Sequence, residues 1–171
     1  MDGVFASDGP PNGDGGEGDS TGTPWPQRIK GWPTLVIEAG DSQSLEALRM
    51  DMEWWFRASN HQVKILLLAK LDRHGRRITL EKWVEIQPAA SRPGPRSRPA
   101  TTLRPDRTQE IIITWAPSLA NTPASHAVTR GALQLEFSLL FLRPPGPADG
   151  DLIITVPRLQ LWASRVWDNV D

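Results

Sequence analysis

Residues 31–71 decide the predicted fold, and they read GWPTLVIEAGDSQSLEALRMDMEWWFRASNHQVKILLLAKL. Within them, a short apolar run closed by a glycine is typical of a buried strand over about residues 34–39. Apolar side chains then recur at helical spacing over about residues 42–58, at Leu45, Leu48, Met52, Trp55 and Phe56. Residues 63–71 are continuously apolar at their centre, which predicts a second strand covered on both faces.

A strand, a helix and a strand in so short a stretch predict a parallel crossover. Asp41 or Ser42 would cap the helix, because their side-chain oxygens can accept hydrogen bonds from its first N–H groups. After a turn at residues 72–75, alternating residues predict a hairpin partner that runs antiparallel to the second strand. This part of the chain therefore predicts an α/β fold with a mixed β-sheet.

The rest of the chain adds further strands and a last helix. Strand patterns occur at 110–115, 132–137 and 151–155. Thr155 and Pro157 then begin a helix with an apolar face, formed by Leu159, Trp162, Ala163, Val166 and Trp167. We expect a single α/β domain with a mixed β-sheet. It consists of a β-α-β crossover, a hairpin that follows it, and a C-terminal helix. Of the tryptophans, Trp55, Trp162 and Trp167 are expected in the core, and Trp54 is expected to be partly exposed.

Two segments are not expected to form a core. Residues 1–24 hold seven of the 14 glycines, five acidic residues and no Lys or Arg, which predicts a disordered acidic tail before a domain at 25–171. Residues 88–109 contain five arginines, one acidic residue and several prolines, which predicts a mobile loop within the domain.

The composition also excludes several classes of protein. The chain has no cysteine, so a disulfide scaffold, a thiolate zinc site and a cysteine nucleophile are all excluded. The N-terminus lacks the pattern of a signal peptide, and no apolar run is long enough to span a bilayer. We expect a cytoplasmic or nuclear protein that does not contact a membrane.

Glu38 is the most notable single residue. It is a carboxylate near the C-terminal end of an otherwise apolar strand, just before a helix begins. Ligands in open α/β sheets gather beyond the carboxyl ends of strands, which favours a functional role. The alternative is a structural role, in which Glu38 accepts hydrogen bonds from the N–H groups at the start of the helix.

The segments GWPTLVIEAG, SLxxLRxDxxWW, VKILLL and LEKW in residues 31–86 resemble an uncharacterised group of fungal proteins. That group is in turn similar to the PD-(D/E)XK restriction-endonuclease-like superfamily. The resemblance implies a restriction-endonuclease-like core, and for active members it implies a Mg²⁺ or Mn²⁺ site made by two acidic residues with a lysine nearby.

Carried onto this chain, the resemblance makes Glu38 the metal-binding strand carboxylate, with Asp51 on the following helix as a substitute second acid. Lys70 or Lys64 would stabilise the phosphoryl transition state. Lys70 lies at the same strand end as Glu38 in a parallel pair, whereas Lys64 opens its strand. The superfamily usually takes its other acid from an earlier strand, and residues 1–30 show no strand pattern. The core would then be truncated.

Two functions remain open on these grounds. The first is a degenerate, non-catalytic binding or scaffold module, with no cofactor. The second is a Mg²⁺- or Mn²⁺-dependent nuclease with Glu38 as metal ligand. In the first case the arginines of the Pro/Arg-rich segment would bind nucleic acid or an acidic protein surface: Arg92, Arg96, Arg98, Arg104 and Arg107. The alternative is that this segment only connects two strands.

Overall fold

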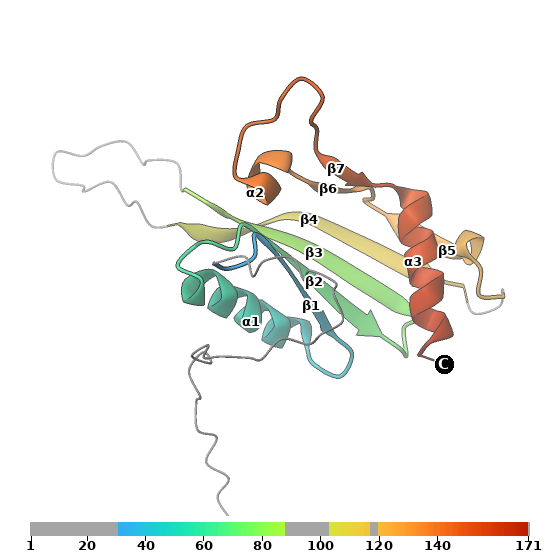
Figure 1. Ribbon diagram of the computed structural model, residues 1–171. Helices are drawn as coiled ribbons and strands as arrows, with labels where there is room; N and C mark the ends of the chain where they lie inside the picture. The colour runs from blue at the N-terminus through green and yellow to red at the C-terminus, as the bar shows by residue number, and fades with distance from the viewer. Residues whose placement is uncertain (1–30, 88–102, 117–119, 171) are drawn as a thin grey trace, which may run out of the picture. The chain divides into compact units, whose positions relative to one another are not determined.

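The computed structural model describes residues 31–87, 103–116 and 120–170, and Gly31–Asp171 form one compact unit. The predictions for residues 1–24, and for Arg92, Arg96 and Arg98, concern residues outside the described ones. The main sheet has five strands in the order β1-β2-β3-β4-β5, and a second sheet pairs β6 with β7 (Figure 1). In chain order the elements are β1 (Leu35–Gly40), α1 (Leu45–Ala58), β2 (Ile65–Asp72), β3 (Arg77–Ile86), β4 (Arg104–Trp115), a 3-10 turn η1 (Pro123–Ser125), β5 (His126–Thr129), β6 (Leu133–Leu135), α2 (Phe137–Phe141), β7 (Leu152–Ile154) and α3 (Val156–Asp168).

The predicted crossover and hairpin are confirmed. β1 and β2 are parallel, in a register that runs from Leu35 opposite Ile65 to Gly40 opposite Lys70. β3 pairs with β2 in the antiparallel direction. The predicted helix cap was wrong: α1 starts at Leu45, so the residue directly before it, Ser44, is the cap, and its hydroxyl accepts a hydrogen bond from the Ala47 N–H at 3.1 Å.

The predicted loop at 88–109 was too long, because residues 104–109 belong to β4. This part of β4 pairs with β3, and Arg104 lies opposite Ile86. β5 pairs with Ile112 to Trp115, so among the described residues the first half of β4 has a strand on one side only, and a proline such as Pro105 is tolerated at such an edge. Local composition suggested a loop, but pairing with a long neighbouring strand decided the conformation.

The two strands predicted near the C-terminus do not join the main sheet as expected. They are the short strands β6 and β7, which pair with each other. The predicted strand at 132–137 also ends early, because Phe137 begins the short helix α2. A three-residue strand carries too weak a pattern to show which sheet it will join.

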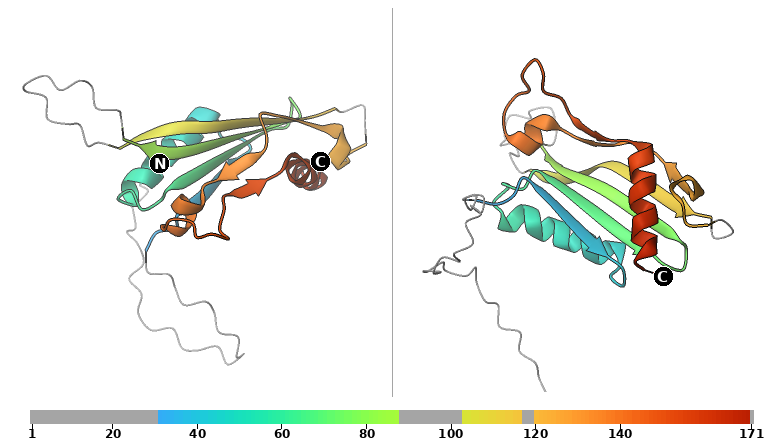
Figure 2. Two further views of the ribbon diagram at one scale, coloured as in Figure 1. Left: turned by 90° about the horizontal axis from the view of Figure 1, so that it is seen from above. Right: turned by 45° about the vertical axis from the view of Figure 1, so that its right-hand side comes forward.

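The main sheet separates two hydrophobic clusters. On one face, α1 packs on β1 and β2 through Leu48, Met52 and Phe56, which meet Val36, Leu66 and Leu68. On the other face lie α3, β6 and β7, whose buried residues pack against alternate residues of β2, β3 and β4. Figure 2 shows α1 on one side of the sheet and these later elements on the other.

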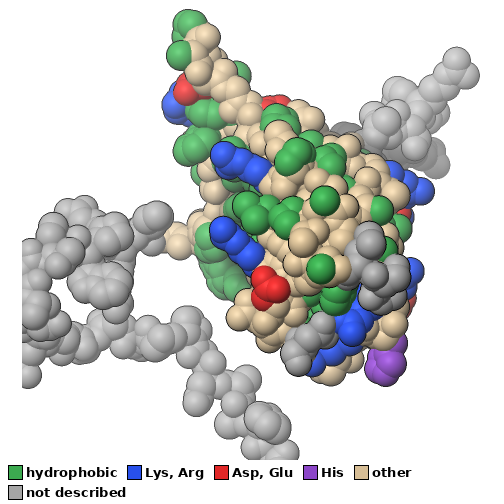
Figure 3. Space-filling model, turned by 90° about the vertical axis from the view of Figure 1, so that its right-hand side faces the viewer, with side chains coloured by type: hydrophobic (Ala, Val, Ile, Leu, Met, Phe, Trp, Pro, Cys, Tyr) green, Lys and Arg blue, Asp and Glu red, His purple; other side chains and the backbone are tan. Residues whose placement is uncertain are grey.

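α3 buries a narrower face than its sequence predicted. Trp167 is 1% exposed and lies in the core as expected, but Trp162 is 38% exposed, so its predicted core position was wrong. The contact with the sheet is made by Leu159, Ala163 and Trp167, which are buried, and it leaves Leu161 and Trp162 on the outer surface. Figure 3 views the molecule from the side on which α3 lies and shows hydrophobic and basic side chains side by side.

Trp54 is 54% exposed, as predicted. Trp55, predicted in the core, is partly buried and packs against the α1 cluster from its edge. In the part of the chain that the structure describes, no helix has the length and apolar character needed to cross a membrane.

Candidate functional site

Glu38 lies in the C-terminal half of β1, as the sequence predicted, and it shares with Val36 the face that α1 covers. Its partner, however, is not the start of the helix. Its carboxylate accepts a hydrogen bond from Trp55 Nε1 at 2.5 Å. Trp55 belongs to the last part of α1, because the helix runs back over the strand that precedes it. Trp55 also makes edge-on contacts with Trp32 and Trp54, at ring-centroid distances of 5.8 and 5.2 Å. Glu38 therefore holds an indole in place.

The other residues that the resemblance implied have partners of their own. Asp51 accepts a hydrogen bond from the Gln43 side-chain amide at 2.6 Å. Lys64 Nζ donates to the main-chain oxygen of His61 at 2.5 Å, and Lys70 Nζ donates to the main-chain oxygen of Asp41. No group of three or more His, Asp and Glu side chains within residues 31–87, 103–116 and 120–170 is placed to hold a metal ion.

Lys70 does lie at the strand end predicted for it. It is opposite Gly40 in the register of β1 and β2, two residues beyond the Glu38–Leu68 pair. Residues two apart on a strand lie on the same face, so Lys70 and Glu38 share the face that α1 covers in part. Lys64 precedes β2, at the opposite end.

The most extensive polar cluster centres on Glu81, in the middle of β3. Its side chain is fully buried, at 0% exposure. Arg49 of α1 binds it with two hydrogen bonds, from Nε at 3.1 Å and from Nη2 at 2.6 Å. Arg107 Nη1 donates at 2.6 Å and Trp83 Nε1 at 3.0 Å. This carboxylate therefore ties α1 to β3 and β4.

The surroundings of Glu81 keep it charged. Burial would raise the pKa of the carboxyl, but the hydrogen bonds from Arg49, Arg107 and Trp83 outweigh burial and hold this pKa below its usual value. The same contact raises the pKa of Arg49. The cluster thus contains a fixed carboxylate bound by two permanent cations.

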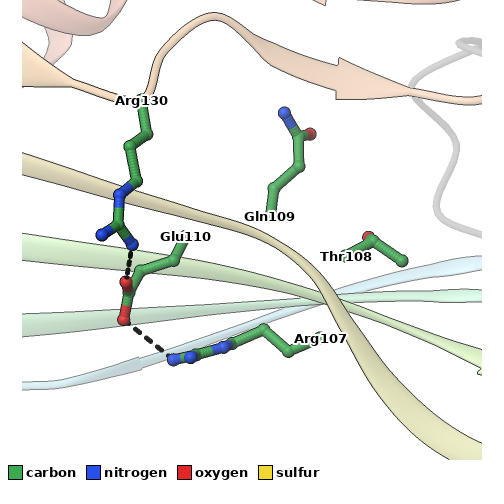
Figure 4. A pocket seen from close by; sticks show the side chains of 5 residues that line it. All are labelled: Arg107, Thr108, Gln109, Glu110 and Arg130. Carbon is green, nitrogen blue, oxygen red and sulfur yellow. Dashed lines mark hydrogen bonds and ion pairs between the residues drawn. The ribbon is translucent and has the colours of Figure 1, made fainter.

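A second carboxylate extends the cluster to the surface. Glu110 lies opposite Glu81 on β4, and each of its oxygens accepts from a different arginine: Oε1 from Arg107 Nη1 at 2.8 Å, and Oε2 from Arg130 Nη1 at 2.5 Å. Figure 4 shows Glu110 between these two guanidinium groups. A cavity of about 410 Å³ adjoins them, lined by Arg107, Thr108, Gln109, Glu110 and Arg130. We call this set the β4 arginine site.

The β4 arginine site has spare donors. Arg130 is 70% exposed and Arg107 is 37% exposed. Within the described residues, each guanidinium forms hydrogen bonds only through Nη1. The Nε and Nη2 atoms of both arginines are therefore available as donors. With Arg49 and Glu81 included, three arginines face Glu81 and Glu110, and Glu46 also lies 3.9 Å from Arg49, so the charges nearly balance. An anionic group entering this cavity would therefore be bound through the unused N–H groups of the guanidinium groups.

Of the arginines named as candidate partner contacts, Arg107 belongs to this site. Arg104 is exposed at the start of β4, opposite Ile86. The sequence pattern did not identify Glu81, Glu110 or Arg130, because a charged residue in or beside a strand is common and gives no functional signal. An acidic residue between Leu80 and Lys82 gave no sign of complete burial. Only pairing across the sheet, at the Glu81–Glu110 position, revealed the cluster.

Searches against protein-family models, curated proteins and solved structures found no match to this chain. The restriction-endonuclease-like relationship therefore stays a prediction.

Proposed function

We propose that this chain is a non-catalytic binding module, built on a restriction-endonuclease-like core, that binds the phosphate groups of a nucleic acid at the β4 arginine site. The observation that carries the proposal is the Glu110 carboxylate, which orients two partly exposed guanidinium groups beside one cavity. Guanidinium groups match phosphate oxygens well, because their N–H donors form a planar fork. Holding both groups in advance lowers the entropy lost on binding.

Two further features support this function. Two arginines of the Pro/Arg-rich segment, Arg104 and Arg107, lie on β4, and Arg107 belongs to the site. The residues that a nuclease would need are already bonded to protein groups: Glu38 to Trp55, and Lys70 to the main chain. The same core without a paired acidic site would keep binding and lose cleavage.

Binding of a fluorescein-labelled single-stranded DNA of about 20 nucleotides, followed by fluorescence anisotropy over a range of salt concentrations, tests the proposal. We expect binding that weakens steeply with salt, and the substitution Arg130→Gln should reduce the slope of log K against log salt by about one. The matched control is Arg143→Gln, because Arg143 is also an exposed arginine paired with one carboxylate, Asp149 at 2.7 Å, and it does not line this cavity.

Three outcomes would contradict the proposal. Equal losses of DNA binding in Arg130→Gln and Arg143→Gln would show that the β4 arginine site is not where DNA binds. Binding of polyglutamate in place of DNA would make the partner an acidic protein surface. Cleavage of the DNA in Mg²⁺ or Mn²⁺ that disappears in Glu38→Ala would restore the nuclease alternative.

A further inference from the structure

A second cavity lies at the carboxyl ends of the two parallel strands. Its volume is about 450 Å³, and its lining includes Asp41 and Ser42 after β1, Lys70 and Asp72 at the end of β2, and Arg77 and Thr79 at the start of β3. We call it the strand-end cavity. This volume is within the range of small-molecule sites, about 300–1,000 Å³. Ligands of open α/β sheets also gather outside the carboxyl ends of parallel strands.

The lining carries more positive than negative charge. Arg73, which also lines the cavity, pairs with the Asp41 carboxylate, and Arg77 pairs with Asp72 at 3.3 Å. Asp72 also accepts a hydrogen bond from the Gly75 N–H at 2.9 Å, which lowers the pKa of this carboxyl and keeps it ionised. Both acids are therefore matched by an arginine. Among the described residues, the Lys70 ammonium bonds only to the main-chain oxygen of Asp41, so its charge is the excess.

The donors of the strand-end cavity converge from two strands and a loop. Lys70 lies directly opposite Thr79 in the β2–β3 register, and Asp72 lies opposite Arg77, so these four side chains share one face of the sheet. The hydroxyls of Ser42 and Thr79 form no hydrogen bond with any described residue. Leu45 adds an apolar part to the lining. An ammonium group, two hydroxyls and the edge of a guanidinium can together satisfy more than two acceptor oxygens.

We propose that the strand-end cavity binds a small organic phosphate monoester, with the phosphate at Lys70, Ser42 and Thr79 and the organic group toward Leu45. A phosphate monoester fits because it offers three terminal oxygens on one atom, whereas a carboxylate offers two. This site shares no residue with the β4 arginine site, so it goes beyond the function proposed above and stands or falls separately.

Isothermal titration calorimetry of the full chain tests the inference, with phenyl phosphate, inorganic phosphate and benzoate as probes. We expect phenyl phosphate to bind more tightly than the other two. Lys70→Met should weaken its binding by about tenfold or more, the equivalent of one charged contact. Lys64→Met is the matched control, because Lys64 also donates to a main-chain oxygen but at the other end of β2. It should leave the affinity unchanged, as should Arg130→Gln.

Thr79→Val is a second variant, which removes one hydroxyl at nearly constant volume, and it should weaken binding several-fold even if Lys70→Met does not fold. Benzoate binding as tightly as phenyl phosphate would make the site a carboxylate site and overturn the ligand class. If inorganic phosphate binds as tightly as phenyl phosphate, the organic group contributes nothing and the proposal of a monoester is wrong. Equal losses in Lys64→Met and Lys70→Met, or no heat with any probe, would overturn the site itself.

Discussion

The substitution Glu81→Gln should be among the most damaging conservative changes in this domain. It keeps the shape of the side chain but removes the charge that holds Arg49 and Arg107. Breaking a buried ion pair by removing one partner costs about 3–5 kcal/mol. The two arginine side chains are 33% and 37% exposed, so water partly replaces the lost contacts, and the lower end of that range applies. We expect a loss of about 3 kcal/mol in the free energy of unfolding.

Urea unfolding measures this loss, with tryptophan fluorescence and circular dichroism as independent probes of the transition. With a slope of about 2 kcal/mol per molar urea, the midpoint should fall by about 1.5 M. The control is Glu46→Gln, because the Glu46 carboxylate also lies near Arg49, at 3.9 Å, but is 79% exposed. Such an exposed pair is worth about 0.5 kcal/mol.

A double-mutant cycle with Arg49→Met isolates the contact between helix and sheet, and it should give a coupling energy of about 1–3 kcal/mol. A loss below about 1 kcal/mol for Glu81→Gln would refute the account of Glu81 as a buried carboxylate that binds α1 to the sheet. Equal losses for Glu81→Gln and Glu46→Gln would refute it as well.

Three other predictions concern different parts of the fold. Burial lowers the pKa of His126, so as pH falls the unfolded chain binds a proton at this residue before the folded chain does, and stability should fall below about pH 6.5. Urea midpoints measured at several pH values should show this fall in the unchanged protein and not in His126→Gln. Lys82 is 2% exposed and donates to Glu136 at 2.6 Å, so Lys82→Met should lower the free energy of unfolding by about 3 kcal/mol. A urea midpoint within error of that of the unchanged protein would contradict this. Trp167→Ala should cost about 3–5 kcal/mol because it empties core volume, whereas Trp162→Ala on the outer face of α3 should cost under about 1 kcal/mol, and thermal melts that rank the two variants in the opposite order would rule out this packing.

The local elements with strong periodicity could be predicted from the sequence. The apolar runs in β1 and β2 and the helical spacing of Leu48, Met52 and Phe56 were enough to place the crossover, because each pattern spans its whole element. The short strands β5, β6 and β7 span only three or four residues, too few for a period to be recognised. Residues 104–109 were predicted as loop from their composition, but pairing with β3 makes them strand.

The candidate site divides in the same way. The sequence by itself determined that Glu38 and Lys70 lie toward the carboxyl ends of neighbouring parallel strands, because strand direction follows from the crossover. Only the tertiary structure decided that Glu38 binds Trp55, and that Glu81 and Glu110 lie opposite each other with Arg49, Arg107 and Arg130 around them. Register and side-chain pairing between strands and a helix far apart in the chain depend on the packed core, so no local pattern carries them.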